Sequence, residues 1–289
     1  MQRNWHIGVI GGSGLAAGIE LNDAQQIEVA SPFGLPSSAV TTGTLAGVRF
    51  TFLPRHGAGH AIPPSVVNYR ANIDVLKRCG VSDIVAVSAI GSLNSAMAPG
   101  HFVAVDQFID RTVGRESSFF GPGLVAHVSL ADPVCARLCA GLAEAARLEE
   151  AAVHQGGCYI AIEGPQFSTR AESKLYQSWG ADVIGMTAMP EARLAREAEL
   201  PYALIGMVTD YDSWRESDEG VDAAEVMRVM ARNTQLAHNV LRRFAQMLPK
   251  RRAPSPIDRA LEHAVMTAPD ARDPVLVAKL NAVAGRLLG

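Results

Sequence analysis

The strongest constraint on the fold is a series of short apolar segments, rich in β-branched residues, that alternate with segments of helical periodicity. Several segments are apolar throughout, which is typical of strands covered on both faces. This alternation predicts an α/β fold: one domain with a central mixed β-sheet flanked by helices. The expected strands are residues 6–10, 48–53, 83–89, 102–108, 158–162, 181–186 and 202–208.

Helical periodicity predicts helices over residues 65–80, 132–148, 189–198 and 222–248. We assign residues 1–248 to the main domain and residues 249–289 to a linker with a C-terminal helical extension. The linker, PKRRAPSP, carries an exposed basic cluster in this interpretation, and two short helices follow it. These helices are too few for an independent domain, so we expect them to dock onto the main domain or onto a neighbouring subunit.

Composition excludes several classes of function. The 289 residues are 48% hydrophobic and 19% charged, which allows a sizeable core. The net charge of −3 gives no basic field for nucleic acid or an anionic membrane. The N-terminus lacks a signal-peptide layout, and no stretch approaches a membrane span. The four cysteines form no CxxC pair, so we expect reduced thiols in a cytoplasm and no zinc site.

Two glycine-bearing segments follow predicted strands. In GVIGGSGL, residues 8–15, the glycines allow backbone N–H groups to close on an anion, and Ser13 adds a hydroxyl. A tight turn at a strand exit explains the segment equally well. Arg55 and His56 precede Gly57, and their side chains offer donors suited to phosphate. An ordinary charged loop remains the alternative.

Other polar and aromatic residues stand at strand ends. Ser88 and Thr187 offer hydroxyls, although a strand-to-loop transition and a helix cap explain them as well. Phe167 could stack on a flat base or anchor a buried loop. Asp210 and Asp212 follow an apolar run within VTDYDSW, where a surface turn would also favour Asp. Together these residues suit a ligand with a phosphate part and a base part.

A series of motifs then makes a family recognisable: IGGSGL, RHG…H…P…VNYRANI, SAIGSL, DQFIDRT, EGPQFSTRAES, WGADVIGMT…PEARLARE and TDYDSW. In order and spacing they closely resemble the 5′-methylthioadenosine phosphorylase family, in the trimeric branch of the purine nucleoside phosphorylases. The resemblance runs from about residue 5 to residue 248. It implies phosphorolysis of methylthioadenosine to adenine and 5-methylthioribose 1-phosphate, a reaction of purine and methionine salvage. It implies no metal or organic cofactor.

The resemblance also assigns residues. Met186 would lie against ribose, Phe167 against the purine, and Asp210 and Asp212 at its N7 and 6-amino edge. The implied phosphate-binding residues are Ser13, Arg55, His56, Ser88, Ala89 through its backbone, and Thr187.

Glycosidic cleavage leaves positive charge on the sugar, and adenine leaves best when N7 is protonated. We assign the acid to Asp210, and we expect burial and the Asp212 carboxylate to raise its pKa. Arg55, His56 and the hydroxyls would orient phosphate. A carboxylate accepts from a 6-amino group but repels a 6-oxo group, and relatives acting on 6-oxopurines carry Asn at position 210. The sequence therefore predicts preference for adenine.

The family resemblance further implies specificity residues. Ser168, Ala223 and Val226 would shape the substrate pocket, with an apolar helix face suited to a methylthio group. His127 would enter the 5′ pocket of the adjacent subunit, which implies a homotrimer or a dimer of trimers.

Two alternatives remain at this point. One is a broader purine nucleoside phosphorylase that accepts adenosine or inosine, which the small Ala223 leaves open. The other is a purine-nucleoside binding protein without catalysis. A methylthioinosine phosphorylase is disfavoured because both Asp residues are present.

Overall fold

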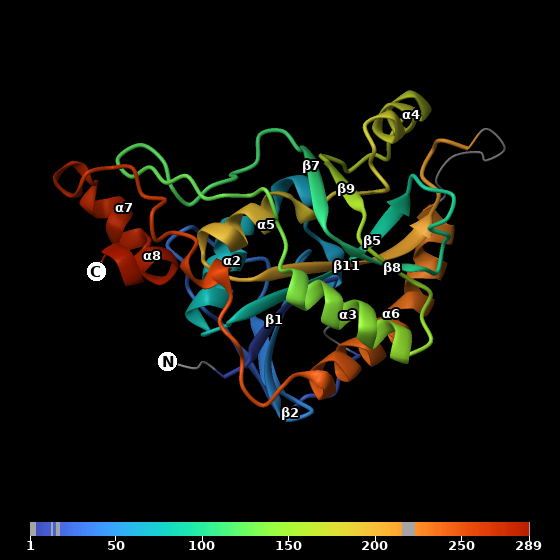
Figure 1. Cartoon of the computed structure of the whole chain (residues 1–289), viewed down its shortest axis with the longest axis horizontal. Helices are drawn as coiled ribbons and strands as arrows, with labels where there is room; N and C mark the ends of the chain where they lie inside the picture. Colours follow the sequence, from blue (N-terminus) through green and yellow to red (C-terminus); the bar gives the residue numbers. More distant parts are fainter. Residues whose placement is uncertain (1–3, 13, 16–17, 216–222, 289) are drawn as a thin grey trace.

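The computed structural model describes residues 4–12, 14–15, 18–215 and 223–288. One mixed sheet forms its centre, with helices on both sides, which confirms the predicted α/β fold (Figure 1). The described strands are β1 (His6–Gly11), β2 (Asn22–Ile27), β3 (Val40–Leu45), β4 (Val48–Pro54), β5 (Asp83–Ser92), β6 (Phe102–Val105), β7 (Gln107–Arg111), β8 (Val153–Gln155), β9 (Cys158–Ile162), β10 (Val183–Gly185) and β11 (Tyr202–Asp210).

Strand β5 is the branch point of the sheet. One of its edges pairs in parallel with β11 along most of its length. The other edge pairs first with β1, over residues 83–86, and then with β10 at Gly91 and Ser92. Residues 87–90 lie between these two partners, so the sheet opens there. One arm continues through β1, β4, β3 and β2, another through β10, β9 and β7, and a third through β11, β6 and β8.

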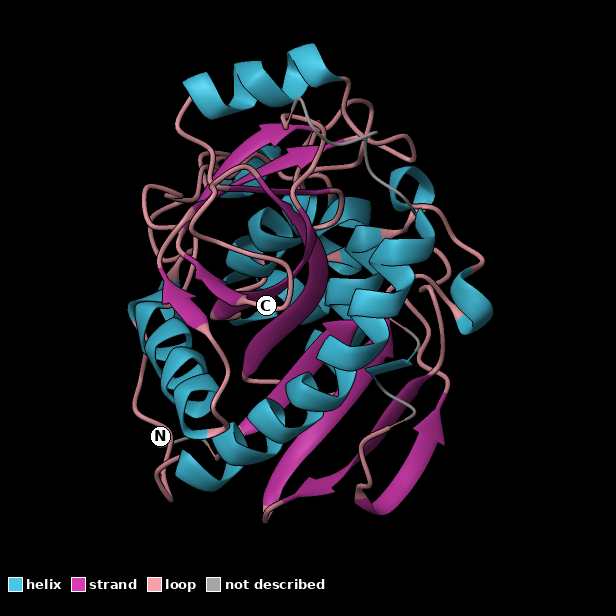
Figure 2. Cartoon of the chain, turned by 90° about the vertical axis from the view of Figure 1, so that its right-hand side faces the viewer, coloured by secondary structure: helices cyan, strands magenta, loops and turns pink. Residues whose placement is uncertain are grey.

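The apolar segments predicted as strands form the inner part of the sheet. β1 is buried throughout, as is β11 up to its last residue, Asp210, because helices cover both faces (Figure 2). The expected strand 102–108 is two strands, β6 and β7. Asp106 separates them, and its carboxylate accepts a hydrogen bond from Gly157 N at 3.0 Å. The prediction missed β2, β3 and β8. β2 left no apolar pattern because this polar edge strand is exposed along its whole length.

Two helix pairs sandwich the centre of the sheet, and α4 stands apart near β9 (Figure 1). α3 and α6 pack on each other and against β11, while α2 and α5 pack together on the opposite side. The described helices are α2 (Tyr69–Arg78), α3 (Ala136–Leu148), α4 (Arg170–Ser178), α5 (Ala188–Glu197), α6 (Ala223–Met247), α7 (Pro274–Lys279) and α8 (Asn281–Leu288). None of these described helices has the length and apolar character needed to cross a membrane.

Capping residues set where two helices begin. The Asn68 side chain accepts from Ala71 N at the start of α2. Thr169 and Glu172 form a reciprocal capping box at the start of α4. The box fixes the direction of the chain just after Phe167, which lies in the loop between β9 and α4. The position of this aromatic residue relative to α4 is therefore defined.

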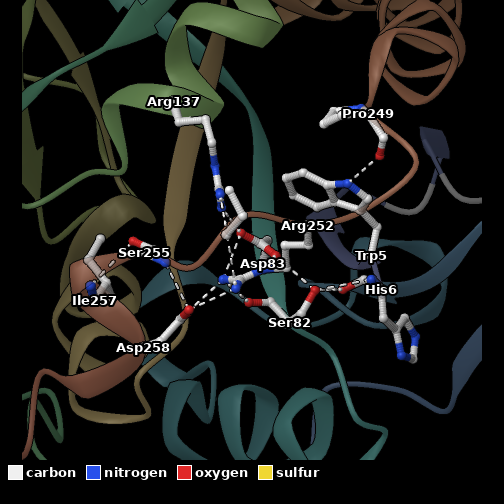
Figure 3. Close-up of polar contacts among 11 residues, drawn as sticks. Trp5, His6, Ser82, Asp83, Arg137, Pro249, Arg252, Ser255, Ile257 and Asp258 are labelled. Atoms are coloured by element: carbon white, nitrogen blue, oxygen red, sulfur yellow. Dashed lines mark hydrogen bonds and ion pairs between the residues drawn. The ribbon is translucent and has the colours of Figure 1, made fainter. Parts of the chain in front are cut away.

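The linker after α6 differs from its prediction at one residue. Lys250 and Arg251 are exposed as expected, but Arg252 is only 3% exposed, so the exposed basic cluster was wrong there. Its guanidinium binds the fully buried Asp83 at the start of β5 (Figure 3). The reason is electrostatic: a buried carboxylate is stable only when cations and donors surround it.

We call this group of side chains the basal cluster: Ser82, Asp83, Arg137, Arg252 and Asp258. Arg137 Nη2 donates to Asp83 Oδ1 at 2.9 Å, and Ser82 Oγ donates to Asp83 Oδ2 at 2.8 Å. Arg252 also donates to both oxygens of Asp258, at 2.7 and 2.6 Å (Figure 3). The cluster holds the linker against the end of the sheet where β5 begins.

The rest of the C-terminal segment lies on the main domain. α8 packs on α2, and Arg286 donates to Glu199 at 2.7 Å. The first expected helix of this segment is shorter, a single 3₁₀ turn over Pro256–Arg259. A domain division at residue 248 stays a prediction.

Candidate active site

A cavity of about 480 Å³ opens where the sheet divides. Residues 87–91 of β5 line it, and so do the last residues of β11 and the residues after β4 and β10. α6 supplies a further wall through Val226, Met227 and Met230. The cavity therefore lies at the carboxyl ends of parallel strands, where ligands bind in open α/β sheets.

The cavity brings together most of the residues that the sequence singled out. Ser13 lies outside the described residues, while Ser168, Ala223 and His127 lie away from the cavity wall. The predicted residues on the wall are Arg55, His56, Ser88, Ala89, Phe167, Met186, Thr187, Asp210, Asp212 and Val226.

Ser88 and Thr187 meet although 99 residues separate them in the chain. Their hydroxyl oxygens are 3.2 Å apart, and Ser88 Oγ also contacts Ala89 O at 3.1 Å. Thr187 occupies the position before α5, yet its side chain makes no capping hydrogen bond. The hydroxyl is therefore directed to Ser88, so the helix-cap explanation of Thr187 is not what the structure contains.

Arg55 lies almost fully buried on the cavity wall, and Glu191 of α5 holds most of its donors. Nε and Nη2 donate to the two Glu191 oxygens at 2.8 and 3.0 Å. The remaining nitrogen, Nη1, has one longer contact, 3.4 Å to Val87 O. Burial alone would lower the pKa of the guanidinium, but Glu191 raises it above its ordinary value. Arg55 is therefore a fixed positive charge whose fork is already occupied by a carboxylate.

His56 differs from the donor that the sequence suggested. Its Nδ1 contacts Ile62 O at 2.8 Å, and its ring stacks on His60 with centroids 4.1 Å apart. Because a carbonyl only accepts, the proton belongs on Nδ1. Burial and the neighbouring Arg55 charge lower the pKa of His56 to about 4. Near neutral pH the ring is therefore uncharged, and Nε2 is an acceptor rather than a second donor.

Asp210 and Asp212 lie together at the end of β11. Asp210 Oδ1 accepts from Thr209 Oγ1 at 2.6 Å, and Oδ2 accepts from Asp212 N at 2.9 Å. Ser173 Oγ of α4 donates to Asp212 Oδ2. Asp212 has a φ of 47°, the left-handed conformation that turns its backbone N–H toward Asp210.

Burial raises the pKa of both carboxyl groups. For Asp210 burial is the main cause, and the bonds from Thr209 and from Asp212 N lower the pKa in part. The Asp212 backbone N–H lowers the pKa of Asp210, and the expected contribution of the Asp212 carboxylate to that pKa stays a prediction. For Asp212, burial is again the largest cause, and the Asp210 charge raises the pKa further. The pair can thus hold a proton beside the cavity.

Apolar side chains complete the cavity. Phe167 is 45% exposed while lining the cavity, so it is not the buried anchor of the alternative interpretation. Met186 comes from the loop between β10 and α5, and Ile162 and Ile184 lie nearby on the wall. An exposed aromatic ring at the mouth and apolar walls behind it suit a flat heterocycle.

Three predicted specificity residues lie elsewhere. Ser168 is buried next to Phe167, and among the described residues its Oγ has no hydrogen-bond partner. Ala223 is exposed at the first residue of α6, so it is Val226, one turn later, that reaches the cavity. His127 is exposed, and its backbone N–H donates to Ala264 O at 2.8 Å.

Sequence reasoning missed several residues at the site. Glu191 is a buried carboxylate within a helix, and no spacing links it to Arg55 in the sequence. Met230 lies four residues after Val226 and could have been found from the helical period, whereas Met227, one residue after Val226, could not. Arg115 contacts the loops around the cavity from a connection that has no regular secondary structure, so no pattern marks it.

The comparisons with known proteins agree with this geometry. The Phosphorylase superfamily profile matches residues 6–246. The chain is 56% identical to the S-methyl-5′-thioadenosine phosphorylase of Cereibacter sphaeroides, over 98% of each chain. It is 53% identical to that of Bradyrhizobium diazoefficiens, again over 98% of each.

Solved structures agree as well. A methylthioadenosine phosphorylase from an antarctic soil metagenomic library has a TM-score of 0.89 at 42% identity, covering 97% of this chain and 99% of the other. A mutant adenosine/methylthioadenosine phosphorylase from Schistosoma mansoni, in complex with methylthioadenosine, has a TM-score of 0.77 at 37% identity. That match covers 83% of this chain and 90% of the other.

The fold and the cavity define a protein of the phosphorylase class, with a polar anion region beside an apolar region for a base. Within that class, the chain belongs to the S-methyl-5′-thioadenosine phosphorylase family of the phosphorylase superfamily.

Proposed function

We propose that this protein cleaves S-methyl-5′-thioadenosine with inorganic phosphate, giving adenine and S-methyl-5-thio-α-D-ribose 1-phosphate. The observation that carries the proposal is the pair Asp210 and Asp212. Their buried carboxyl groups, whose pKa values are raised, line the same cavity as the hydroxyl pair of Ser88 and Thr187. One wall thus suits a leaving base, and another suits an anionic nucleophile.

Phosphate would bind at the opening in the sheet. The hydroxyls of Ser88 and Thr187 and the backbone of Ala89 supply hydrogen bonds, and Arg55, whose charge is paired with Glu191, offers its Nη1 group as a further donor. His56, neutral with an accepting Nε2, matches the one P–OH group of hydrogen phosphate. Ser13 belongs to the proposed phosphate set, although it lies outside the described residues.

The chemical step exchanges one bond for another. A phosphate oxygen forms a bond to the anomeric carbon as the bond from that carbon to purine N9 breaks. Asp210 donates its proton to N7, so that adenine leaves as a neutral base. A raised pKa is what this role requires, because the carboxyl group must hold a proton before the step. The phosphate charge balances the positive charge that develops on the sugar.

Asp212 would select the base. A carboxylate oxygen accepts a hydrogen bond from a 6-amino group, whereas a 6-oxo group would face it with a lone pair. Phe167 would lie against the purine face, and Met186 against ribose. The apolar face of α6 would receive the methylthio group, with Val226 and Met230 as its wall. Ser168 and Ala223 stay proposed specificity residues that would act from beside the cavity.

A comparison of four substrates tests the proposal. Phosphate-dependent base release would be measured with methylthioadenosine, adenosine, inosine and methylthioinosine. We expect the highest kcat/KM for methylthioadenosine and the lowest for the two 6-oxopurines. Preference for inosine would contradict the role given to the Asp pair. Tight binding of methylthioadenosine with no adenine release would instead identify a binding protein without catalysis.

A broader specificity is the second candidate. The Schistosoma mansoni relative is an adenosine/methylthioadenosine phosphorylase by its name. Ala223, exposed at the start of α6, is also a small residue, so this end of the helix has room beside a 5′ substituent. In that case adenosine would approach methylthioadenosine in kcat/KM in the same assay.

We also propose a homotrimer that shares its active sites, with a dimer of trimers as the larger alternative. His127 is exposed and lies outside its own cavity, which is compatible with a role in a neighbouring subunit. Solution mass measured with and without residues 250–289 tests the assembly and the proposed extension. A cytoplasmic location stays a prediction, to be checked with a fluorescent fusion.

A further inference from the structure

Arg115, in the irregular connection after β7, contacts several separate segments of the chain. Its side chain is 3% exposed, and it forms an ion pair with Glu163 through two contacts of 3.1 Å. A cation buried to this degree must be surrounded by acceptors, because its transfer out of water is costly. The acceptors that surround Arg115 come from three different segments.

Four of these acceptors are backbone carbonyl oxygens. Nη2 donates to Glu163 O at 2.8 Å and lies 3.5 Å from Ile162 O, at the end of β9. Nη1 donates to Met186 O at 2.7 Å and to Met189 O at 2.9 Å, on either side of the start of α5. One guanidinium therefore joins the loop after β9 to the loop after β10.

A third segment joins through a tyrosine. Arg115 Nη1 donates to Tyr69 Oη at 3.0 Å, and Tyr69 Oη donates to Pro64 O at 2.9 Å. Pro64, Ile162 and Met186 all line the cavity. The contacts of one side chain thus reach three parts of the cavity wall.

The packing around Gly164 supports the same interpretation independently. Gly164 has a φ of 66°, and a Cβ at this position would lie 2.4 Å from Met186 Sδ. The turn after β9 therefore packs directly on Met186, and a larger residue at position 164 would have to displace the Met186 side chain. The position of Met186 depends on how this turn is held, and Arg115 holds the turn through Glu163.

We propose that Arg115 is a positioning residue for nucleoside binding: it fixes Met186 and the loop that leads to Phe167. The inference rests on the proposed function, since it names the substrate that these two side chains would contact. Lysine cannot replace the guanidinium, because a single ammonium group cannot reach acceptors on three segments in a planar fork. Of the described residues proposed to bind phosphate, Thr187 lies between the two carbonyl groups that Arg115 holds, whereas Ser88 and His56 come from other elements, so the phosphate region depends less on Arg115 than the nucleoside region does.

The test is the Arg115→Lys variant, assayed for the separate KM values of nucleoside and phosphate. We expect the nucleoside KM to rise roughly tenfold or more, which corresponds to the loss of one or two charged hydrogen bonds. The change in the phosphate KM should be smaller. The matched control is Arg252→Lys, a buried arginine at the other end of the sheet. It should lower stability and leave both KM values within about twofold.

The outcomes separate the hypotheses. A merely structural role would reduce the amount of folded Arg115→Lys enzyme without changing either KM, and this result would overturn the inference. If Arg115→Lys does not fold, Tyr69→Phe serves instead, because it removes the hydroxyl between Arg115 and Pro64; an unchanged nucleoside KM in Tyr69→Phe would also overturn it. Absence of phosphorolysis in the unmodified protein would contradict the proposed function itself.

Discussion

The carboxyl groups at the two ends of β5 have opposite surroundings. At its start, Asp83 receives hydrogen bonds from Arg252, Arg137 and Ser82 in the basal cluster. Beside its other end, Asp210 accepts only from its chain neighbours, Thr209 Oγ1 and Asp212 N, among the described residues. Asp83 is fully buried and faces cations, whereas Asp210 is partly buried and accepts from no cation among the described residues.

The difference separates a structural site from a reactive one. A buried carboxylate that is paired with guanidinium groups fixes chain segments to each other, as Asp83 does for the linker after α6. Burial away from cations raises the pKa of a carboxyl group, and burial is the main cause that raises the pKa of Asp210. The cavity end of the sheet is therefore the end where a proton can be exchanged with a ligand.

The largest expected effect is on turnover in Asp210→Asn. An amide can hydrogen-bond to N7 but cannot transfer a proton, so we expect kcat with methylthioadenosine to fall roughly 10²–10⁴-fold. Inosine should gain relative to methylthioadenosine, because Asn donates to a 6-oxo group or to N7. Steady-state phosphorolysis of both nucleosides checks this. Asp212→Asn, which keeps the Asp210 carboxyl group, should lose less kcat; equal losses would refute the assignment of the acid to Asp210.

The next effect concerns stability. In Asp83→Asn, Arg137 loses its carboxylate partner and Arg252 keeps Asp258 alone of its two, so the free energy of unfolding should fall by about 3–5 kcal/mol. Denaturant titration measures this change, and proteolysis within residues 249–256 should accelerate. The folded fraction should keep its kcat.

The matched control for Asp83→Asn is Glu262→Gln. Glu262 and Arg286 are both 36% exposed, so this pair should contribute less than about 1 kcal/mol. A loss of kcat in folded Asp83→Asn enzyme, or equal destabilisation by the two variants, would remove the distinction between the ends of β5.

The smallest effect is a shift in pH dependence. The bond from Thr209 lowers the pKa of Asp210, so Thr209→Val should raise that pKa further. The proposed acid, Asp210, would act while protonated, so we expect activity to be lost as pH rises through its pKa. The alkaline limb of kcat/KM should therefore move to higher pH in Thr209→Val. A shift to lower pH would show that the limb belongs to another group, whereas Thr209→Ser, which keeps the hydroxyl, should leave it in place.

Much of the fold follows from local pattern. β1 and β11 were predicted because wholly apolar runs are stable only between two layers of helices. β2 was missed because a polar edge strand has no buried face to leave a pattern. The branch at β5 was also missed, since it depends on which strands pair with each half of one edge.

The site likewise has features that the sequence indicated and features that depend on tertiary contacts. Residue types and motif order indicated Asp210, Ser88 and Thr187, because the chemistry of an anion and a base requires such groups. The sequence could not indicate that Glu191 occupies the fork of Arg55, or that the His56 proton lies toward Ile62 O. These states are set by contacts between residues far apart in the chain.

By itself, the sequence determined the α/β class and placed the candidate site residues at strand ends. Hydrophobic period and motif spacing are local properties, so a single chain displays them directly. Only the tertiary structure decided which buried carboxyl groups are paired with cations and which have their pKa raised by burial. Burial and the nearest cation set that balance, and both arise when distant segments such as Arg252 and Asp83 come into contact.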